Sequence, residues 1–280
     1  MSLKAYVPVR QGQVATLTYL VSLFTFYLMV LGDVEWWAMA LTESIAYVIM
    51  LLIIDLKIVQ IAFISHSLGL VFSLGALVAA SDYSFSYFGC YMMGISFFHF
   101  SEYVTQAIFN PSTLSLDSFL INHSWEYGVA AVASWVEFWI EYYFFPGMKT
   151  YRLVCWVGLL LVVVGETLRK VAMFTAGSNF THQVQYRKRP NHTLVTTGVY
   201  FYCRHPSYVG WFYWSVGTQL LLCNPLCSVG YAVASWLFFN ERIVDEEELL
   251  IHFFGDDYIQ YQSRVGTGIP FITGHKPKTS

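Results

Sequence analysis

Long apolar segments recur along this chain, and they constrain its fold more than any other feature of the sequence. The first, residues 14–31, contains no charged side chain. A helix needs about 20 mostly apolar residues to cross the roughly 30 Å hydrocarbon core of a bilayer. Charged residues make up only 12% of the chain, about half of the share that a soluble domain carries. The sequence therefore predicts an integral membrane protein without a sizeable soluble domain.

Prolines and charged residues divide the apolar sequence into eight predicted spans. Pro111, Pro146 and Pro225 mark three of the breaks, because proline lacks the amide hydrogen that a helix interior needs. The predicted spans are residues 14–31, 36–54, 58–80, 85–109, 122–145, 152–168, 206–222 and 226–239. We therefore predict an all-α integral membrane protein with eight transmembrane helices, a long polar loop and a C-terminal helix.

This architecture is expected to be a single domain over residues 1–280. Six spans occupy residues 1–175, and residues 176–280 hold the polar loop, a helical hairpin and an amphipathic helix at 240–262. Residues from 266 onwards are expected to be frayed.

Basic residues predict the orientation of the spans, because cytoplasmic loops carry the excess of lysine and arginine. With eight spans, thirteen of the fifteen basic residues fall on the side shared by both termini, and only Lys149 and Arg152 lie opposite. Both termini and the loop 176–205 are therefore expected in the cytosol. Glycosylation-like triplets begin at Asn122, Asn179 and Asn191 on that side, and we expect them to be unmodified. No cleaved signal peptide is expected.

Several classes of function are disfavoured by composition. The net charge is -3 and no basic stripe is present outside one loop, so nucleic acid is not an expected partner. The five cysteines lie mostly in apolar surroundings without a CxxC pair, so no metal site is expected. The acidic residues inside the spans are scattered and are expected to reach an interface or a neighbouring helix, which disfavours a channel or transporter. They are Glu43, Glu102, Glu126, Glu137 and Glu141.

The stretch 192–210, HTLVTTGVYFYCRHPSYVG, is where chemistry is expected. The residue before a proline is extended, and proline suits the first turn of a helix. The segment Arg204-His205-Pro206-Ser207-Tyr208 therefore predicts a helix start whose backbone amides face the polar loop and form an anion site. The alternative is an interfacial loop followed by an ordinary helix.

A second cluster, FFNERIVDEEELL, covers residues 238–250. In a helix, Arg242 and Glu246 share one face, and Phe239 and Ile243 share another. Arginine is suited to binding a carboxylate through two nitrogens, so a site role is expected for Arg242 and Glu246. The other acidic residues of the run are expected to form a solvated surface; they are Asp245, Glu247 and Glu248.

The two motifs VTTGVYFYCRHPSYVGWF and NERIVDEEELL together resemble those of the isoprenylcysteine carboxyl methyltransferases of the endoplasmic reticulum, in particular the animal ones. The resemblance implies S-adenosylmethionine as methyl donor. It implies as acceptor the C-terminal carboxylate of a farnesylated or geranylgeranylated cysteine on small GTPase-like proteins, presented at the membrane lipid.

The resemblance also implies roles for single residues. It assigns Arg242 to the substrate carboxylate, as the catalytic residue. It assigns eleven residues to the cofactor: Gln185, His192, Thr193, Leu194, Val195, Tyr200, His205, Pro206, Ser207, Tyr208 and Glu246. A C-terminal carboxylate, with a pKa of roughly 3.5, is already ionised at pH 7, so its methylation needs no general base.

Three other functions fit parts of the sequence. Membrane sterol reductases carry a similar RHPxYxG-like stretch and bind NADPH, and phospholipid N-methyltransferases share the hairpin plan with a lipid amine as acceptor. Binding of NADPH in place of S-adenosylmethionine favours the reductase. A lipid-binding or transport protein is the non-enzymatic alternative, and it predicts that His205→Ala leaves function intact.

Overall fold

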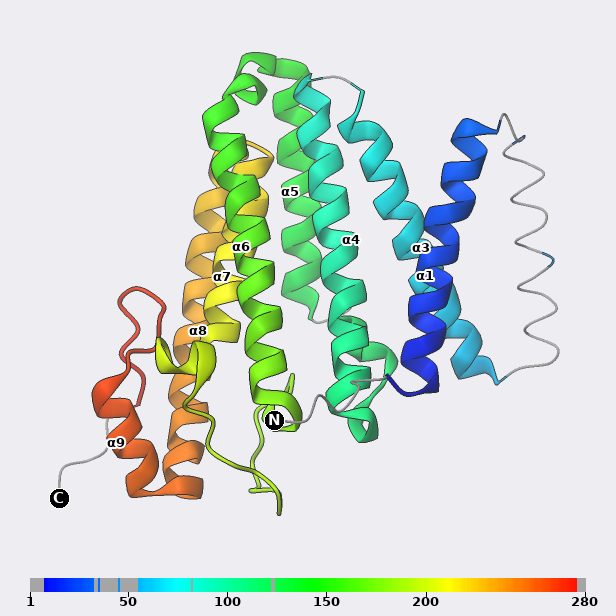
Figure 1. Cartoon of the computed structure of the whole chain (residues 1–280). Coiled ribbons are helices and arrows are strands. Elements are labelled where there is room, and N and C mark those ends of the chain that lie inside the picture. The colour runs from blue at the N-terminus through cyan, green and yellow to red at the C-terminus, as the bar shows by residue number, and fades with distance from the viewer. Residues whose placement is uncertain are drawn as a thin grey trace. The chain divides into compact units, whose positions relative to one another are not determined.

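The computed structural model describes residues 8–32, 35, 45, 55–81, 83–121 and 124–275, and all regular structure in these residues is helical (Figure 1). The predicted all-helical class is therefore confirmed for the described part of the chain. Nearly all of the predicted span 36–54, including Glu43, lies outside the described residues. The chain divides into two compact units, Met1–Gly128 and Val129–Ser280.

The first unit contains α1 (Arg10–Leu31), α3 (Leu56–Ala79) and α4 (Tyr83–Phe109). Asp55 caps α3 because its side chain accepts a hydrogen bond of 2.7 Å from the Lys57 amide. Two short 3-10 turns, η1 (Pro111–Thr113) and η2 (Leu116–Phe119), follow α4. Residues from all three helices and η2 form the core: Ala15, Tyr19, Ile61, Leu68, Tyr103 and Phe119.

The remaining helices build the second unit, with α5 beginning at the end of the first. They are α5 (Trp125–Phe144), η3 (Pro146–Thr150), α6 (Arg152–Ala176), η4 (Gly177–Asn179), η5 (Gly198–Phe201), α7 (Pro206–Leu221), α8 (Pro225–Phe254) and α9 (Asp256–Arg264). Pro206 and Pro225 start α7 and α8, as proline favours the first helical position. The two helices form the predicted hairpin.

Helices α6 and α7 pack with their backbones in contact. A Cβ atom at Gly165 would overlap the carbonyl oxygen of Gly210 and the amide of Trp214, and one at Gly158 would overlap the backbone of Leu221. Small residues allow this close approach between membrane helices. This seam between α6 and α7, at Gly158 and Gly165, fixes the start of α7 against α6.

The C-terminal part differs from the prediction. α8 is one continuous helix of 30 residues, and the chain turns at Gly255 with φ 57° instead of beginning a separate helix near residue 240. Residues 266–275 are also packed rather than frayed: Ile269 and Ile272 are buried in a cluster with α7 and α8. Tertiary packing explains the difference: the tail has no regular secondary structure, but its two isoleucines are buried in this cluster, which holds it in place.

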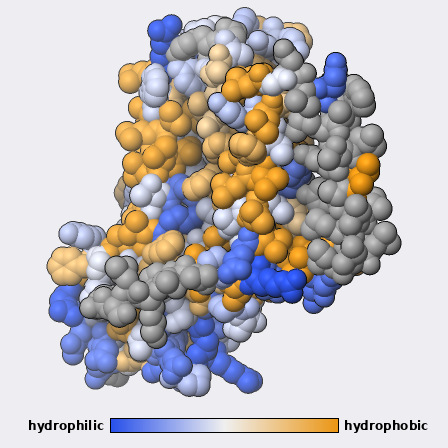
Figure 2. All heavy atoms as spheres, turned by 45° about the vertical axis from the view of Figure 1, so that its right-hand side comes forward, coloured by the Kyte–Doolittle hydropathy of each residue, from blue (hydrophilic) through white to orange (hydrophobic). Residues whose placement is uncertain are grey.

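Two described helices, α1 and α3, are long and apolar enough to cross a membrane on length and composition alone. The predicted number of eight spans is therefore not confirmed. α7 has only 16 residues, and charged side chains interrupt the apolar sequence of α6 and α8. Figure 2 shows apolar side chains over the helices and hydrophilic ones gathered at the lower end, near the α8–α9 junction of Figure 1.

Acidic residues of α5 hold the turn of the α7–α8 hairpin, Glu137 directly and Glu141 through Lys149. Glu137 accepts hydrogen bonds of 2.7 Å from the amides of Leu226 and Cys227, and Glu141 pairs with Lys149 at 2.6 Å. An acidic side chain at a helix N-terminus compensates the positive end of the helix dipole. For Glu137, the prediction that a neighbouring helix binds it is confirmed, whereas Glu141 pairs with a lysine of η3, the turn that follows its own helix.

Candidate functional site

A cavity in the second unit lies between the loop after α6, the start of α7 and the end of α8. Its wall includes hydrophobic side chains from the loop and from α8, such as Leu194, Val195, Leu250 and Phe253. It brings together ten of the eleven residues that the sequence resemblance assigns to the cofactor: Gln185, His192, Thr193, Leu194, Val195, Tyr200, His205, Ser207, Tyr208 and Glu246. Pro206 and Arg242 are described but do not belong to the wall.

The loop that forms one side of the cavity is held by its own polar side chains. Asn179 both accepts from the Thr193 amide at 2.9 Å and donates to the Thr193 hydroxyl at 3.2 Å. Lys188 donates to the carbonyl of Phe253 at 2.6 Å, and the ring of His192 packs edge-on against Phe254 at 5.2 Å. These contacts join the loop to the end of α8.

His192 supplies a buried polar atom to this wall. Its Nδ1 is buried and has no hydrogen-bond partner among the described residues. Burial, together with the positive charges of Arg189 and Lys188, lowers the pKa of His192, so the ring is neutral at pH 7 and can accept as well as donate. An unpaired buried nitrogen in a cavity wall indicates a polar ligand group.

The start of α7 has the predicted proline geometry but offers fewer amides than expected. The amides of Tyr208 and Val209 both donate to the carbonyl of His205 at 3.0 Å. Ser207 is buried and accepts a hydrogen bond of 2.8 Å from Arg169 of α6. The polar surface of this wall therefore comes more from side chains than from free backbone amides at the start of α7.

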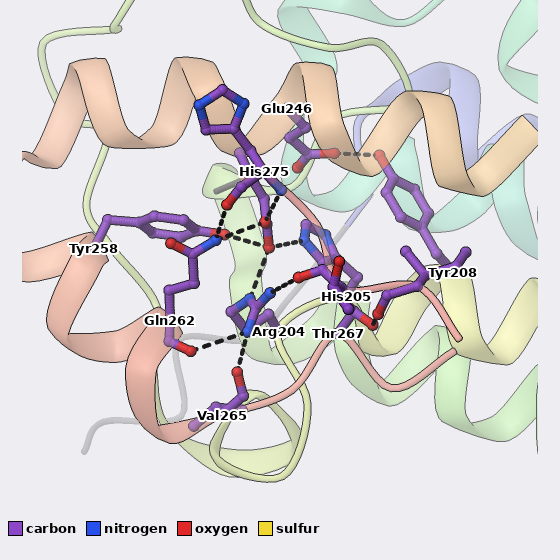
Figure 3. Close-up of polar contacts among 12 residues, drawn as sticks. Arg204, His205, Tyr208, Glu246, Tyr258, Gln262, Val265, Thr267 and His275 are labelled. Carbon is purple, nitrogen blue, oxygen red and sulfur yellow. Dashed lines mark hydrogen bonds and ion pairs between the residues drawn. The ribbon is translucent and has the colours of Figure 1, made fainter. Parts of the chain in front are cut away.

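The carboxylate of Glu247 connects the helix start to the C-terminal part of the chain. One oxygen accepts from Arg204 Nε at 2.7 Å and from His205 Nε2 at 3.1 Å. Figure 3 shows Arg204 and His205, from the segment just before α7, and Tyr258, Gln262 and His275, from α9 and the tail, pointing toward the same centre. The further donors are the Tyr258 hydroxyl at 3.1 Å, the Gln262 amide at 3.0 Å and the His275 backbone amide at 2.8 Å.

Glu247 is fully buried, which corrects the prediction of a solvated surface residue. Burial by itself raises the pKa of a carboxylate, but the hydrogen bonds and electrostatic attraction of His205 and Arg204 lower the pKa of Glu247 to about 2. It is therefore ionised at neutral pH. The signal was in the sequence, because Phe239, Ile243 and Glu247 are four residues apart and share one helix face, and the first two are also buried.

Arg204 was also missed as a site residue. It is buried, and its guanidinium donates to the carbonyls of Gln262, Val265 and Thr273 in addition to Glu247. An arginine followed by a His-Pro pair predicts no particular partner on its own. Its role depends on a tail segment about 60 residues later in the chain.

Arg242 lies beside the cavity and is connected to it through Tyr208. The Nε atom of Arg242 donates to the Tyr208 hydroxyl at 2.9 Å, and that hydroxyl donates to Glu246 at 2.5 Å. The Nη2 atom of Arg242 donates to the carbonyl of His182. Arg242 and Glu246, which the sequence predicts on one helix face, are thus connected through the hydroxyl of Tyr208.

Comparisons with known proteins place these features in a family. A family model described as isoprenylcysteine carboxyl methyltransferase (ICMT) matches residues 156–252. A Homo sapiens protein-S-isoprenylcysteine O-methyltransferase is 58% identical over 217 residues, which are 78% of this chain and 76% of that protein. The protein of that name from Tribolium castaneum is 55% identical over 75% of each chain, and the Saccharomyces cerevisiae one is 41% identical over 76% of this chain and 91% of the other.

A solved structure is also similar over nearly the whole chain. It is the structure of the eukaryotic intramembrane Ras methyltransferase ICMT, without a monobody. Its TM-score is 0.88 at 44% sequence identity, with 96% of this chain and 100% of that chain covered.

Proposed function

The chain belongs to the isoprenylcysteine carboxyl methyltransferase family, and we propose that it transfers a methyl group from S-adenosylmethionine to the C-terminal carboxylate of a prenylated cysteine. It is a membrane enzyme, a carboxyl O-methyltransferase. The acceptors proposed are farnesylated or geranylgeranylated proteins of the small GTPase kind. The observation that carries the proposal is a pair of consecutive hydrogen bonds, from Arg242 to Tyr208 and from Tyr208 to Glu246. They connect a cation to the wall of the cavity.

The cavity fits S-adenosylmethionine in its chemistry. Its wall combines apolar side chains such as Leu194 and Phe253, which suit an adenine ring, with the unpaired Nδ1 of His192 and the carboxylate of Glu246. We propose that this wall holds the donor, with all eleven residues of the motif contributing and Pro206 acting through the helix start. When bound, S-adenosylmethionine supplies a methyl group on a positively charged sulfur.

The residues of the chain then have mainly a positioning role. The acceptor carboxylate, with a pKa of roughly 3.5, is ionised without a general base. Arg242 orients it: Nε and Nη2 already donate to protein oxygens, so Nη1 is the nitrogen that would meet the substrate. Correct alignment of two reactants can contribute roughly 7 to 11 kcal/mol.

We further propose that the enzyme lies in the endoplasmic reticulum membrane with eight spans and with both termini and the site in the cytosol. The excess of basic residues on that side supports this orientation. Each buried CH2 of a prenyl chain favours lipid by about 0.8 kcal/mol. The acceptor's cysteine is therefore presented at the membrane surface, next to a site that faces the cytosol.

The test is transfer of a radiolabelled methyl group from S-adenosylmethionine to N-acetyl-farnesylcysteine by the purified enzyme. We expect a base-labile product, because the methyl group is in an ester. Transfer to phosphatidylethanolamine instead would indicate a phospholipid N-methyltransferase. Binding of NADPH without binding of S-adenosylmethionine would indicate a reductase, and either result would overturn the proposal.

A further inference from the structure

We propose that Cys155 and Cys223 form an intramolecular disulfide bond in the native membrane. Cys155 lies near the start of α6 and Cys223 lies in the turn between α7 and α8. Their sulfur atoms are 3.3 Å apart, and both side chains are buried. A disulfide has a sulfur–sulfur distance of about 2.05 Å, so a shift of little more than 1 Å separates the two thiols from a covalent bond.

The packing of α6 on α7 brings the two cysteines together. Gly158 lets the backbone of α6 contact Leu221 at the end of α7. Cys155 lies nearly one helical turn before Gly158, and Cys223 lies two residues after Leu221. The two thiols therefore face each other at the end of the close contact between α6 and α7.

Lys149 fixes the backbone around Cys223. Its buried ammonium group donates to the carbonyls of Leu222 and Cys223 and to the side chain of Asn224, at 2.9, 3.1 and 2.9 Å. Cys223 itself has φ 50°, a left-handed conformation that costs energy for a residue with a Cβ atom. Because the turn is already ordered, little conformational entropy remains to be lost when the bond forms.

The chemistry depends on the compartment, so the proposal rests on the orientation proposed above. Lys149 and Arg152 are the basic residues assigned to the side opposite the cytosol, which in the endoplasmic reticulum is the oxidising lumen. There a small disulfide such as oxidised glutathione accepts two electrons and two protons from the cysteine pair and becomes two thiols. The exchange passes through a mixed disulfide and takes place while the turn folds, before the thiols are buried.

The bond would enclose residues 155–223, a segment that contains the loop and the helix start of the proposed donor site. A disulfide restricts the unfolded chain more strongly when it closes a long loop. We therefore expect the oxidised enzyme to unfold at a higher temperature than the reduced enzyme.

The first test uses the full-length enzyme while it folds, synthesised in a cell-free system with endoplasmic reticulum membranes in buffers of reduced and oxidised glutathione. The protein is denatured, its free thiols are alkylated, and its peptides are identified by mass spectrometry. We expect a linked Cys155–Cys223 peptide in oxidising buffer, present also in Cys227→Ser and absent in Cys155→Ser and Cys223→Ser. Cys227 is the matched control, since it lies beside the same turn. Alkylation of both thiols at every buffer ratio, or pairing with another cysteine, would overturn the proposal.

The second test uses native membranes that are alkylated before any lysis. Both cysteines should resist alkylation after denaturation until a reductant is added, whereas two free thiols would contradict the proposal. Methyl transfer is measured in the same preparations. Transfer by an enzyme with a reduced pair would leave the proposed function standing while the disulfide proposal fails, so the two are tested separately.

Discussion

Glu247 is a charged residue whose side chain is completely inaccessible to water, and its five hydrogen-bond donors come from the helix start, α9 and the tail. A buried charge is tolerated only when it is paired and hydrogen-bonded. Because His205 also lines the cavity, Glu247 holds a wall residue without belonging to the wall itself. It is a positioning residue.

Replacement of Glu247 by glutamine keeps the size of the side chain but removes its charge. Removal of one partner of a buried ion pair costs about 3 kcal/mol or more, so we expect the apparent Tm in detergent to fall by several degrees and methyl transfer to fall at least tenfold. The matched control is Glu248→Gln, whose side chain is exposed. Equal effects of the two variants would show that Glu247 has no special role.

The pKa of Glu247 also predicts a pH dependence of stability. Its pKa of about 2 in the folded protein is below the ordinary glutamate value of 4.5, so the stabilisation is fully present above about pH 4.5 and is lost as pH falls through 2. The difference corresponds to about 3 kcal/mol. Apparent Tm measured from pH 6 to pH 2 should fall less in Glu247→Gln than in the parent. An identical dependence of the apparent Tm on pH in the parent and in Glu247→Gln would contradict this role.

At the scale of single elements, the start of α7 followed from the sequence and the length of α8 did not. Pro206 marks a helix start by its own chemistry, and the structure places α7 there. The polar residues after Phe239 indicated the end of a span, but they are accommodated within one helix because Arg204 and His205 bind its buried face. Such partners are distant in the chain, so local patterns did not reveal them.

Alanine substitution should have opposite effects at two glycines, one in the seam between α6 and α7 and one outside it. Gly165→Ala places a methyl group against the backbone of α7, and overpacking of this kind costs about 1 to 3 kcal/mol. Gly230 of α8 has open space around it, and Gly230→Ala should stabilise the helix by up to about 1 kcal/mol. Thermal unfolding of both variants checks the pair. A neutral Gly165→Ala would mean that the helices are not in close contact.

At the scale of the whole molecule, the membrane class followed from composition, whereas the packing of the tail did not. Ile269 and Ile272 are buried among α7 and α8, but two apolar residues in an irregular segment have no periodicity that a sequence pattern can detect. The cofactor assignments came from the family resemblance. The cavity brings most of those residues together, but their binding of the donor stays a prediction.

The orientation of the whole chain can be tested with epitope tags at the two termini. When only the plasma membrane of a cell is permeabilised, both tags should be accessible to antibody, because the distribution of basic residues predicts both termini in the cytosol. A tag on an endoplasmic reticulum lumenal protein serves as the control and should stay hidden. Accessibility of only one terminus would require an odd number of spans.

In the proposed function, the cavity holds the methyl donor while Arg242, beside it, holds the acceptor carboxylate. The most direct measurement compares Arg242→Ala with the parent enzyme for affinity toward S-adenosylmethionine and for methyl transfer to N-acetyl-farnesylcysteine, with the exposed Arg264→Ala as control. We expect the donor Kd to change less than about twofold and kcat/KM for the acceptor to fall at least a hundredfold, or about 2.7 kcal/mol. Full transfer by Arg242→Ala, or an equal loss of donor binding and of transfer, would contradict the claim.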